Sequence, residues 1–102
     1  MDNYKVTISH RADLDLEEIY ISSRYRWSFL ETHKYVRDIK AQISTLDKMP
    51  QRFGFDEHTQ RLKAFRSFEH KAHKVFFTID EATKTVHVTA ILPSRTKYAA
   101  KL

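Results

Sequence analysis

Apolar and polar residues alternate in three short stretches of the chain, at residues 4–8, 75–79 and 86–92. A period of two sends apolar side chains to one face of a β-strand and polar ones to the other, so each stretch is predicted to be a strand. The polar segment 80–84 separates the last two, which predicts a β-hairpin. Residues 62–68 are ambiguous, and we count them as a further strand.

Between the first strand and this hairpin, apolar residues repeat at spacings of three and four, the period of an α-helix. Ser9 can cap a first helix from about residue 11 to 26, and the helix dipole accounts for the acidic residues near its start. Its apolar stripe consists of Ala12, Leu16, Ile19, Ser23 and Trp27. A second helix is expected from about residue 29 to 48, because Pro50 follows where a helix cannot continue. Its stripe consists of Val36, Ile39, Ile43 and Leu46.

The resulting order is β-α-α-β-β-β, in which helices and strands are segregated along the chain. This order predicts an α+β fold, with an N-terminal strand and a helical hairpin packed on a mostly antiparallel sheet. The polar segment 51–60 contains Gly54 and is expected to be a loop with at most one helical turn. No repeat or boundary interrupts the pattern, so residues 1–102 are expected to form a single domain.

Composition removes several classes of protein. The absence of cysteine excludes disulfide frameworks, thiolate nucleophiles and cysteine-based zinc sites. A single glycine excludes glycine-rich phosphate loops, and with them P-loop and Rossmann-type sites. No apolar run approaches the ~18 residues of a membrane span, and the N-terminus has no signal core. We therefore expect a cytoplasmic protein that does not bind a membrane.

The chain is basic, with 18 Lys and Arg against 13 Asp and Glu and a net charge of +5. Such an excess favours nucleic acids or acidic proteins as partners through long-range attraction. A basic domain that is merely soluble accounts for the charge equally well. Charge alone therefore leaves open a nucleic-acid-binding or adaptor domain as well as a merely soluble one.

Two stretches resemble the ParE/RelE superfamily of type II toxin-antitoxin toxins, and the resemblance extends over nearly the whole chain. The first is Tyr4-Lys-Val-Thr-Ile-Ser9 with Ala12 and Asp15-Leu-Glu-Glu-Ile19, followed by an aromatic pair at Tyr25 and Trp27. The second is Phe68-Glu-His-Lys-Ala-His-Lys-Val-Phe-Phe-Thr-Ile-Asp80, then Thr85-Val-His-Val-Thr-Ala-Ile-Leu92, then Arg95. Members of the superfamily typically have an aromatic residue or His, then Arg or Lys, then an apolar strand, where this chain has His73-Lys74-Val75.

The resemblance implies a toxin held silent by a co-encoded acidic antitoxin of the ParD/RelB type, in a toxin-antitoxin hetero-oligomer. ParE-like members act on DNA gyrase, whereas RelE-like members cut mRNA on the ribosome. The basic pair that RelE-like toxins place before the closing hairpin falls here at Phe65 and Ser67. The resemblance is therefore closer to ParE-like members and implies inhibition of DNA gyrase; a ribosome-dependent mRNA endonuclease is the alternative.

An RNA-cutting toxin needs a base, an acid and cations around one phosphate. The resemblance implies that Lys74 and Arg95 hold phosphate, and the need for a base and an acid makes His73 or Tyr98 the candidate proton carrier. Contact with the target, whether gyrase or ribosome, is expected from Arg66, Lys74, Arg95, Lys97 and Tyr98. Antitoxin contact is expected from Tyr20, Tyr25 and Trp27, although aromatic residues at a helix-helix junction belong more often to the core.

Three histidines, His70, His73 and His87, raise the question of a zinc site. Imidazole nitrogens bind zinc when they lie ~2.1 Å from one metal ion. Residues three apart on a strand face opposite sides, so His70 and His73 are not expected to share a metal. We expect neither a metal nor a cofactor.

Overall fold

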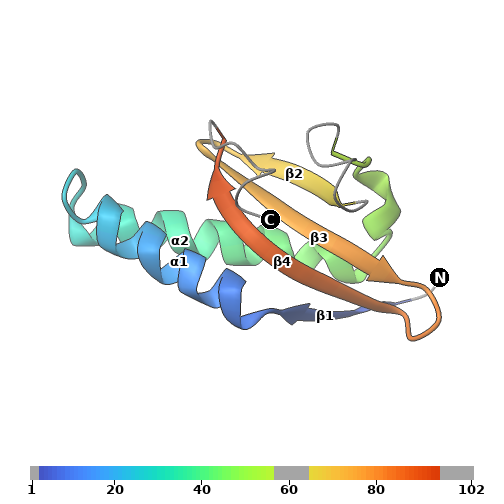
Figure 1. Ribbon diagram of the computed structural model, residues 1–102. Coiled ribbons are helices and arrows are strands. Elements are labelled where there is room, and N and C mark those ends of the chain that lie inside the picture. Colours follow the sequence, from blue (N-terminus) through green and yellow to red (C-terminus); the bar gives the residue numbers. More distant parts are fainter. Residues whose placement is uncertain (1–2, 57–64, 95–102) are drawn as a thin grey trace.

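Residues 3–56 and 65–94 are described in the computed structural model, and they form one strand, two helices and three further strands (Figure 1). In chain order the elements are β1 (Lys5–Ile8), α1 (His10–Ser23), α2 (Phe29–Ser44), β2 (Arg66–His70), β3 (His73–Asp80) and β4 (Thr85–Pro93). Two short 3-10 turns, Thr45–Asp47 and Pro50–Arg52, follow α2. The predicted β-α-α-β-β-β order and the α+β class are confirmed.

The four strands form one sheet in the order β1-β4-β3-β2. β2 pairs with β3 and β3 with β4 in antiparallel register, whereas β1 runs parallel to β4, with Val6 opposite Val86. A parallel pair needs a long connection between its strands, and the helices together with β2 and β3 provide it. The sheet is mostly antiparallel, as predicted, and is mixed only at β1.

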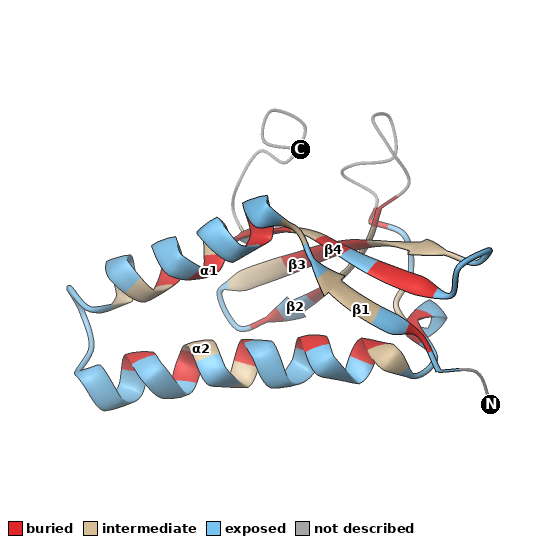
Figure 2. Cartoon of the chain, turned by 90° about the horizontal axis from the view of Figure 1, so that it is seen from below, coloured by how far each residue is buried: buried red, intermediate tan, exposed pale blue. Residues whose placement is uncertain are grey.

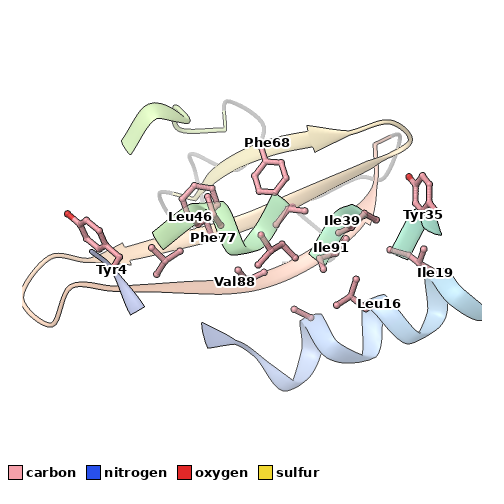
Figure 3. Close-up of a cluster of buried hydrophobic side chains, with 14 residues drawn as sticks. Tyr4, Leu16, Ile19, Tyr35, Ile39, Leu46, Phe68, Phe77, Val88 and Ile91 are labelled. Carbon is pink, nitrogen blue, oxygen red and sulfur yellow. The ribbon is translucent and has the colours of Figure 1, made fainter. Parts of the chain in front are cut away.

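α1 and α2 lie on one face of the sheet and turn their buried residues toward it (Figure 2). The buried residues of this core are Tyr4, Ala12, Leu16, Ile19, Tyr35, Ile39, Ile43, Leu46, Phe68, Val75, Phe77, Val86, Val88 and Ile91 (Figure 3). They come from both helices and from β2, β3 and β4, except for Tyr4, which directly precedes β1, and Leu46, which lies in the first 3-10 turn. Burial of this apolar surface fixes the helices on the sheet.

Helix α1 ends earlier than its apolar stripe predicted. Its last residue is Ser23 rather than about residue 26, and Trp27 is 40% exposed in the connection to α2. The Trp27 backbone N–H closes the helix end by bonding to the Ser23 carbonyl oxygen at 2.8 Å. Figure 1 shows that the hairpin extends past the described strands at this end, so a residue there loses the partner that would bury it.

The strict alternation expected for residues 75–79 has one exception. Phe76 points away from the helices and is nevertheless fully buried. It belongs to a second cluster of buried side chains, which consists of Phe65, Phe76, Ala90 and Leu92. The centre of the sheet is therefore buried on both faces, and such a strand does not alternate cleanly.

The start of α1 is hydrogen-bonded to β4 near Thr89. The register of β3 against β4 shifts at this residue, so that Thr89 has no pairing partner on β3. Ser9 caps the helix as predicted, because its hydroxyl oxygen accepts the Ala12 backbone N–H at 3.0 Å. The same hydroxyl donates to the Thr89 carbonyl oxygen at 2.9 Å. The Asp15 carboxylate accepts the Ile91 backbone N–H at 2.9 Å, so this acidic residue also fixes the helix to the sheet.

Candidate functional site

The candidate residues His73 and Lys74 project from opposite faces of β3. His73 lies on the helix side, with its Nδ1 2.8 Å from the Tyr35 hydroxyl of α2. Lys74 lies on the other side, where its Nζ is 2.8 Å from Asp56 Oδ2. Successive side chains of a strand point to opposite faces, so these two do not meet at one phosphate. The structure does not bring them together, and their catalytic roles stay predictions.

Lys74 and Asp56 form an ion pair that is nearly removed from water. Their side chains are 12% and 3% exposed, respectively. The Ser67 hydroxyl donates a second hydrogen bond, of 2.9 Å, to the same carboxylate oxygen of Asp56. Charge-assisted bonds in such a setting hold the side chains firmly. The sequence showed no sign of this pair, because Asp56 stands in a loop 18 residues before its partner.

On the helix side, Tyr35 joins His70 and His73 into a polar network. The Tyr35 hydroxyl donates to the His70 carbonyl oxygen at 3.2 Å, in addition to its contact with His73. Its ring centroid lies 5.3 Å from the His70 ring and 5.6 Å from the His73 ring. The Nδ1 atom of His70 is 2.9 Å from Gln42 Oε1. The network therefore ties α2 to both β2 and β3 around a buried tyrosine.

The expectation that His70 and His73 face opposite sides is wrong. It treated them as members of one strand, but a two-residue turn separates β2 from β3 and makes them direct partners in the sheet. Partners across an antiparallel pair share a face. His87 is elsewhere, on β4, with its Nδ1 3.0 Å from Thr7 Oγ1. Residues 3–56 and 65–94 contain no group of three potential metal ligands placed to bind one ion.

Burial lowers the pKa of both imidazoles in the network. For His70, loss of solvent is the main cause; the positive charge of Lys71 adds to it, and Asp38 opposes it. For His73, loss of solvent comes first and the neighbouring His70 second. Burial raises the pKa of the Tyr35 hydroxyl, which keeps its proton. Burial thus favours the neutral form of both rings.

Arg66 lies against residues 53–55. Its Nη1 donates to the Phe53 carbonyl oxygen at 2.8 Å, and its guanidinium lies over the Phe55 ring, 4.2 Å from the centroid. These contacts hold the side chain against its own chain, so its role in target binding stays a prediction. Three further candidates lie outside the described residues: Arg95, Lys97 and Tyr98.

The aromatic candidates Tyr20, Tyr25 and Trp27 lie at the end of the helical hairpin that extends past the sheet. Tyr25 is 86% exposed. Trp27 packs on Tyr35 with ring centroids 5.3 Å apart, and the half-buried Tyr20 packs edge-on against Phe29 at 6.5 Å. Large exposed apolar residues of this region are Ile21, Tyr25, Trp27, Phe29 and Leu30. Such a concentration of exposed apolar side chains is typical of a protein contact surface.

Residues 6–98 match the family described as the ParE toxin of the type II toxin-antitoxin system parDE. The chain belongs to this family. Toxin ParE1 of Caulobacter vibrioides is similar to it, with 27% identity over 82 residues that cover 79% of this chain and 82% of ParE1. The resemblance inferred from the sequence is confirmed, and the chain is the toxin component of a toxin-antitoxin system.

Three solved structures share the ParE-like fold at low sequence identity. The chromosomal ParDE system from P. aeruginosa superposes with a TM-score of 0.73 at 17% identity, covering 88% of this chain and 95% of the other. The toxin-antitoxin complex RelBE2 from Mycobacterium tuberculosis gives 0.64 at 17% identity, with 89% and 98% covered. A mutant of the E. coli toxin RelE in the free state gives 0.66 at 8% identity, with 97% and 92% covered. These likenesses establish the fold.

Membership in a toxin-antitoxin family makes an antitoxin the expected partner of this ParE-family toxin, in agreement with the prediction from sequence. Neither of the described helices, α1 and α2, has the length and apolar character needed to cross a bilayer.

Three contributors to the site escaped the sequence analysis: Tyr35, Gln42 and Asp56. Each is a single polar residue in a helix or loop, and a local pattern carries no signal for its distant partner.

Proposed function

We propose that this toxin is a ParE-like poison of DNA gyrase, which blocks DNA replication by binding and performs no chemistry itself. The family match over residues 6–98 carries the proposal. The arrangement on β3 supports it, because Lys74 is engaged by Asp56 and His73 faces the helices. A binding poison needs a complementary surface rather than a convergent set of acid and base groups.

An mRNA endonuclease is the alternative, and the described residues support it less. Cleavage needs a base, an acid and cations around one phosphate, whereas His73 and Lys74 lie on opposite faces of the sheet. The two positions aligned with the basic pair of RelE-like toxins hold no cation. Phe65 is buried, and Ser67 donates its hydroxyl to Asp56.

The deciding experiment adds the free toxin to purified gyrase and relaxed plasmid, and in parallel to ribosomes carrying a labelled mRNA. We expect loss of supercoiling, accumulation of cleaved plasmid after protein digestion, and intact mRNA. Relaxation of the same plasmid by a type I topoisomerase serves as the control for non-specific effects on DNA. Unchanged supercoiling with truncated mRNA would establish the endonuclease, and no effect in either assay would favour a non-toxic adaptor.

The proposed partner is an acidic ParD/RelB-like antitoxin that covers the end of the hairpin, in a hetero-oligomer in the cytoplasm. The net charge of +5 favours an acidic partner, and the exposed rings of Tyr25 and Trp27 offer apolar anchors. Replacing both by alanine is expected to weaken antitoxin binding by about tenfold or more in calorimetry. Leu14→Ala, an exposed apolar position on α1, is the control; equal affinity of the two variants would remove the hairpin end from the interface.

A further inference from the structure

The side of α2 that points away from the sheet carries a row of cations. Lys34, Arg37 and Lys40 are spaced three residues apart, so their side chains are neighbours along the helix surface. All three are exposed, and Figure 2 shows that the exposed positions of α2 lie along its edge turned away from the sheet. We call these three residues the α2 basic face. The other residues on this side of the helix are Leu30, His33, Ala41 and Ser44, so it contains no carboxylate.

The two acidic residues of α2 border the α2 basic face at one end, because Glu31, Lys34 and Asp38 line a common pocket. Glu31 belongs to the N-terminal cap, where its backbone N–H bonds to the Ser28 hydroxyl at 3.2 Å and its carboxylate lies 3.4 Å from that hydroxyl. Asp38 is half-buried, and its charge acts on His70 at the sheet. Within the described residues, no ion pair engages the α2 basic face. Its three charges are therefore available to a partner.

The neighbouring helix has the opposite charge. Asp13, Glu17 and Glu18 are exposed on α1, and its one arginine, Arg11, lies 3.6 Å from Asp15. α1 and α2 run side by side (Figures 1 and 2), so the hairpin has an acidic flank and a basic flank. A polyanion is attracted by one flank and repelled by the other, which selects a single orientation.

We propose that the α2 basic face binds the phosphate backbone of duplex DNA and thereby positions the toxin beside the DNA held by its target. This inference rests on the proposed function, because the DNA in question is the DNA held by gyrase. With a rise of about 1.5 Å per residue, the three cations span roughly 9 Å along the helix. A DNA strand carries a phosphate every ~3.4 Å along its axis, so the three cations can each reach a phosphate of one strand.

Nucleic acid fits this surface better than an acidic protein does. Stable protein interfaces have an apolar centre with a polar rim, whereas the α2 basic face has cations along its whole length. Leu30, at one end, is the only large apolar residue on this side of α2. Phosphate contacts from Lys and Arg need no such centre, because release of condensed counterions drives the binding.

The experiment measures binding of the free toxin to a labelled duplex of ~24 base pairs by fluorescence anisotropy, from about 50 to 200 mM KCl. The α2 variant replaces all three cations by glutamine, which keeps helix propensity: Lys34→Gln, Arg37→Gln and Lys40→Gln. The control variant has the same net charge and replaces three exposed lysines of the sheet and its turns: Lys5→Gln, Lys71→Gln and Lys84→Gln. Circular dichroism confirms that both variants are folded.

We expect the parent and the control variant to bind DNA with the same steep salt dependence. Three phosphate contacts contribute about −2.7 to the slope of log K against log salt, or about 40-fold in affinity over this range, and the α2 variant loses that part. Equal slopes for the α2 variant and the parent would overturn the proposal. The proposal would also be overturned if a poly-aspartate peptide, added at a carboxylate concentration equal to that of the DNA phosphates, displaced the DNA. The surface would then fit an acidic protein.

A supercoiling assay with the same variants separates this inference from the proposed function. If the parent toxin binds DNA through α2 but leaves gyrase active, the DNA contact stands and the gyrase proposal fails. If the α2 variant inhibits gyrase as strongly as the parent and neither binds DNA, the gyrase proposal stands and the DNA contact is refuted. If the α2 variant needs a higher concentration than the parent to inhibit gyrase, by the same factor as its loss of DNA affinity, both proposals are supported.

Discussion

Replacing Lys74 by methionine removes a charge from the nearly dry pair with Asp56 and keeps the apolar stem of the side chain. The side chains are 12% and 3% exposed, and the Nζ to Oδ2 distance is 2.8 Å. The remaining carboxylate keeps its bond from the Ser67 hydroxyl but loses the neighbouring ammonium. Breaking a buried pair from one side costs about 3–5 kcal/mol of unfolding free energy, because the carboxylate stays in the interior without its ammonium group.

Urea denaturation measures this cost directly. With an m-value of roughly 1.5 kcal/mol/M, a loss of about 3 kcal/mol lowers the midpoint by about 2 M. The double variant Asp56→Asn/Lys74→Met removes both charges and is expected to recover most of the loss. Lys84→Met, which removes a lysine from the exposed pair with Glu81, is the matched control and is expected to change the midpoint little.

A midpoint for Lys74→Met equal to that of Lys84→Met would refute the reasoning, because the inner pair would then behave like a solvated one. The double variant also has a functional use. If it is folded and no longer toxic, Lys74 has the target role that the sequence suggested. If it is folded and fully toxic, the contribution of Lys74 is structural.

Two further predictions concern the network on the helix side and the helix cap. The pKa values of His70 and His73 are lowered by burial from the ordinary 6.5, so the unfolded chain binds more protons just below that pH. Their contribution to stability is therefore complete above pH 6.5 and declines as the pH falls through the window beneath it. Urea midpoints at about pH 7.5 and 5.5 test this, and an unchanged pH dependence in a His70→Gln/His73→Gln variant would contradict it. Ser9→Ala is expected to cost about 1–2 kcal/mol in urea denaturation, since it removes both the cap and the bond to Thr89; a cost no larger than that of the exposed Ser22→Ala would argue against the cap.

Much of the fold was predictable because its elements are amphipathic and have different periods. The period-two stretches correspond to β1, β3 and β4, and the three-and-four spacing corresponds to α1 and α2. Errors arose where the environment at a residue differs from its pattern. Trp27 continues the apolar stripe of α1 but lies beyond the sheet. Phe76 stands at a position where the alternation predicts an exposed side chain, yet it is buried on the other face of the sheet.

Less of the candidate site was predictable, since its residues depend on where two distant segments meet. The sequence identified His73 and Lys74 as candidates, and their neighbouring positions suggested a common role. Alternation along a strand places them on opposite faces instead. Their partners, Tyr35 and Asp56, are 38 and 18 residues away in the chain.

The sequence by itself determined the order of the elements, the basic character and the toxin family, because periodicity, composition and motif are local properties of the chain. The tertiary structure alone decided that Lys74 meets Asp56, that Tyr35 joins His70 to His73, and that the charges of the hairpin divide between two flanks. The physical reason is that these contacts depend on the packing of helices onto a sheet. A single substitution can change such packing while the pattern along the chain stays the same.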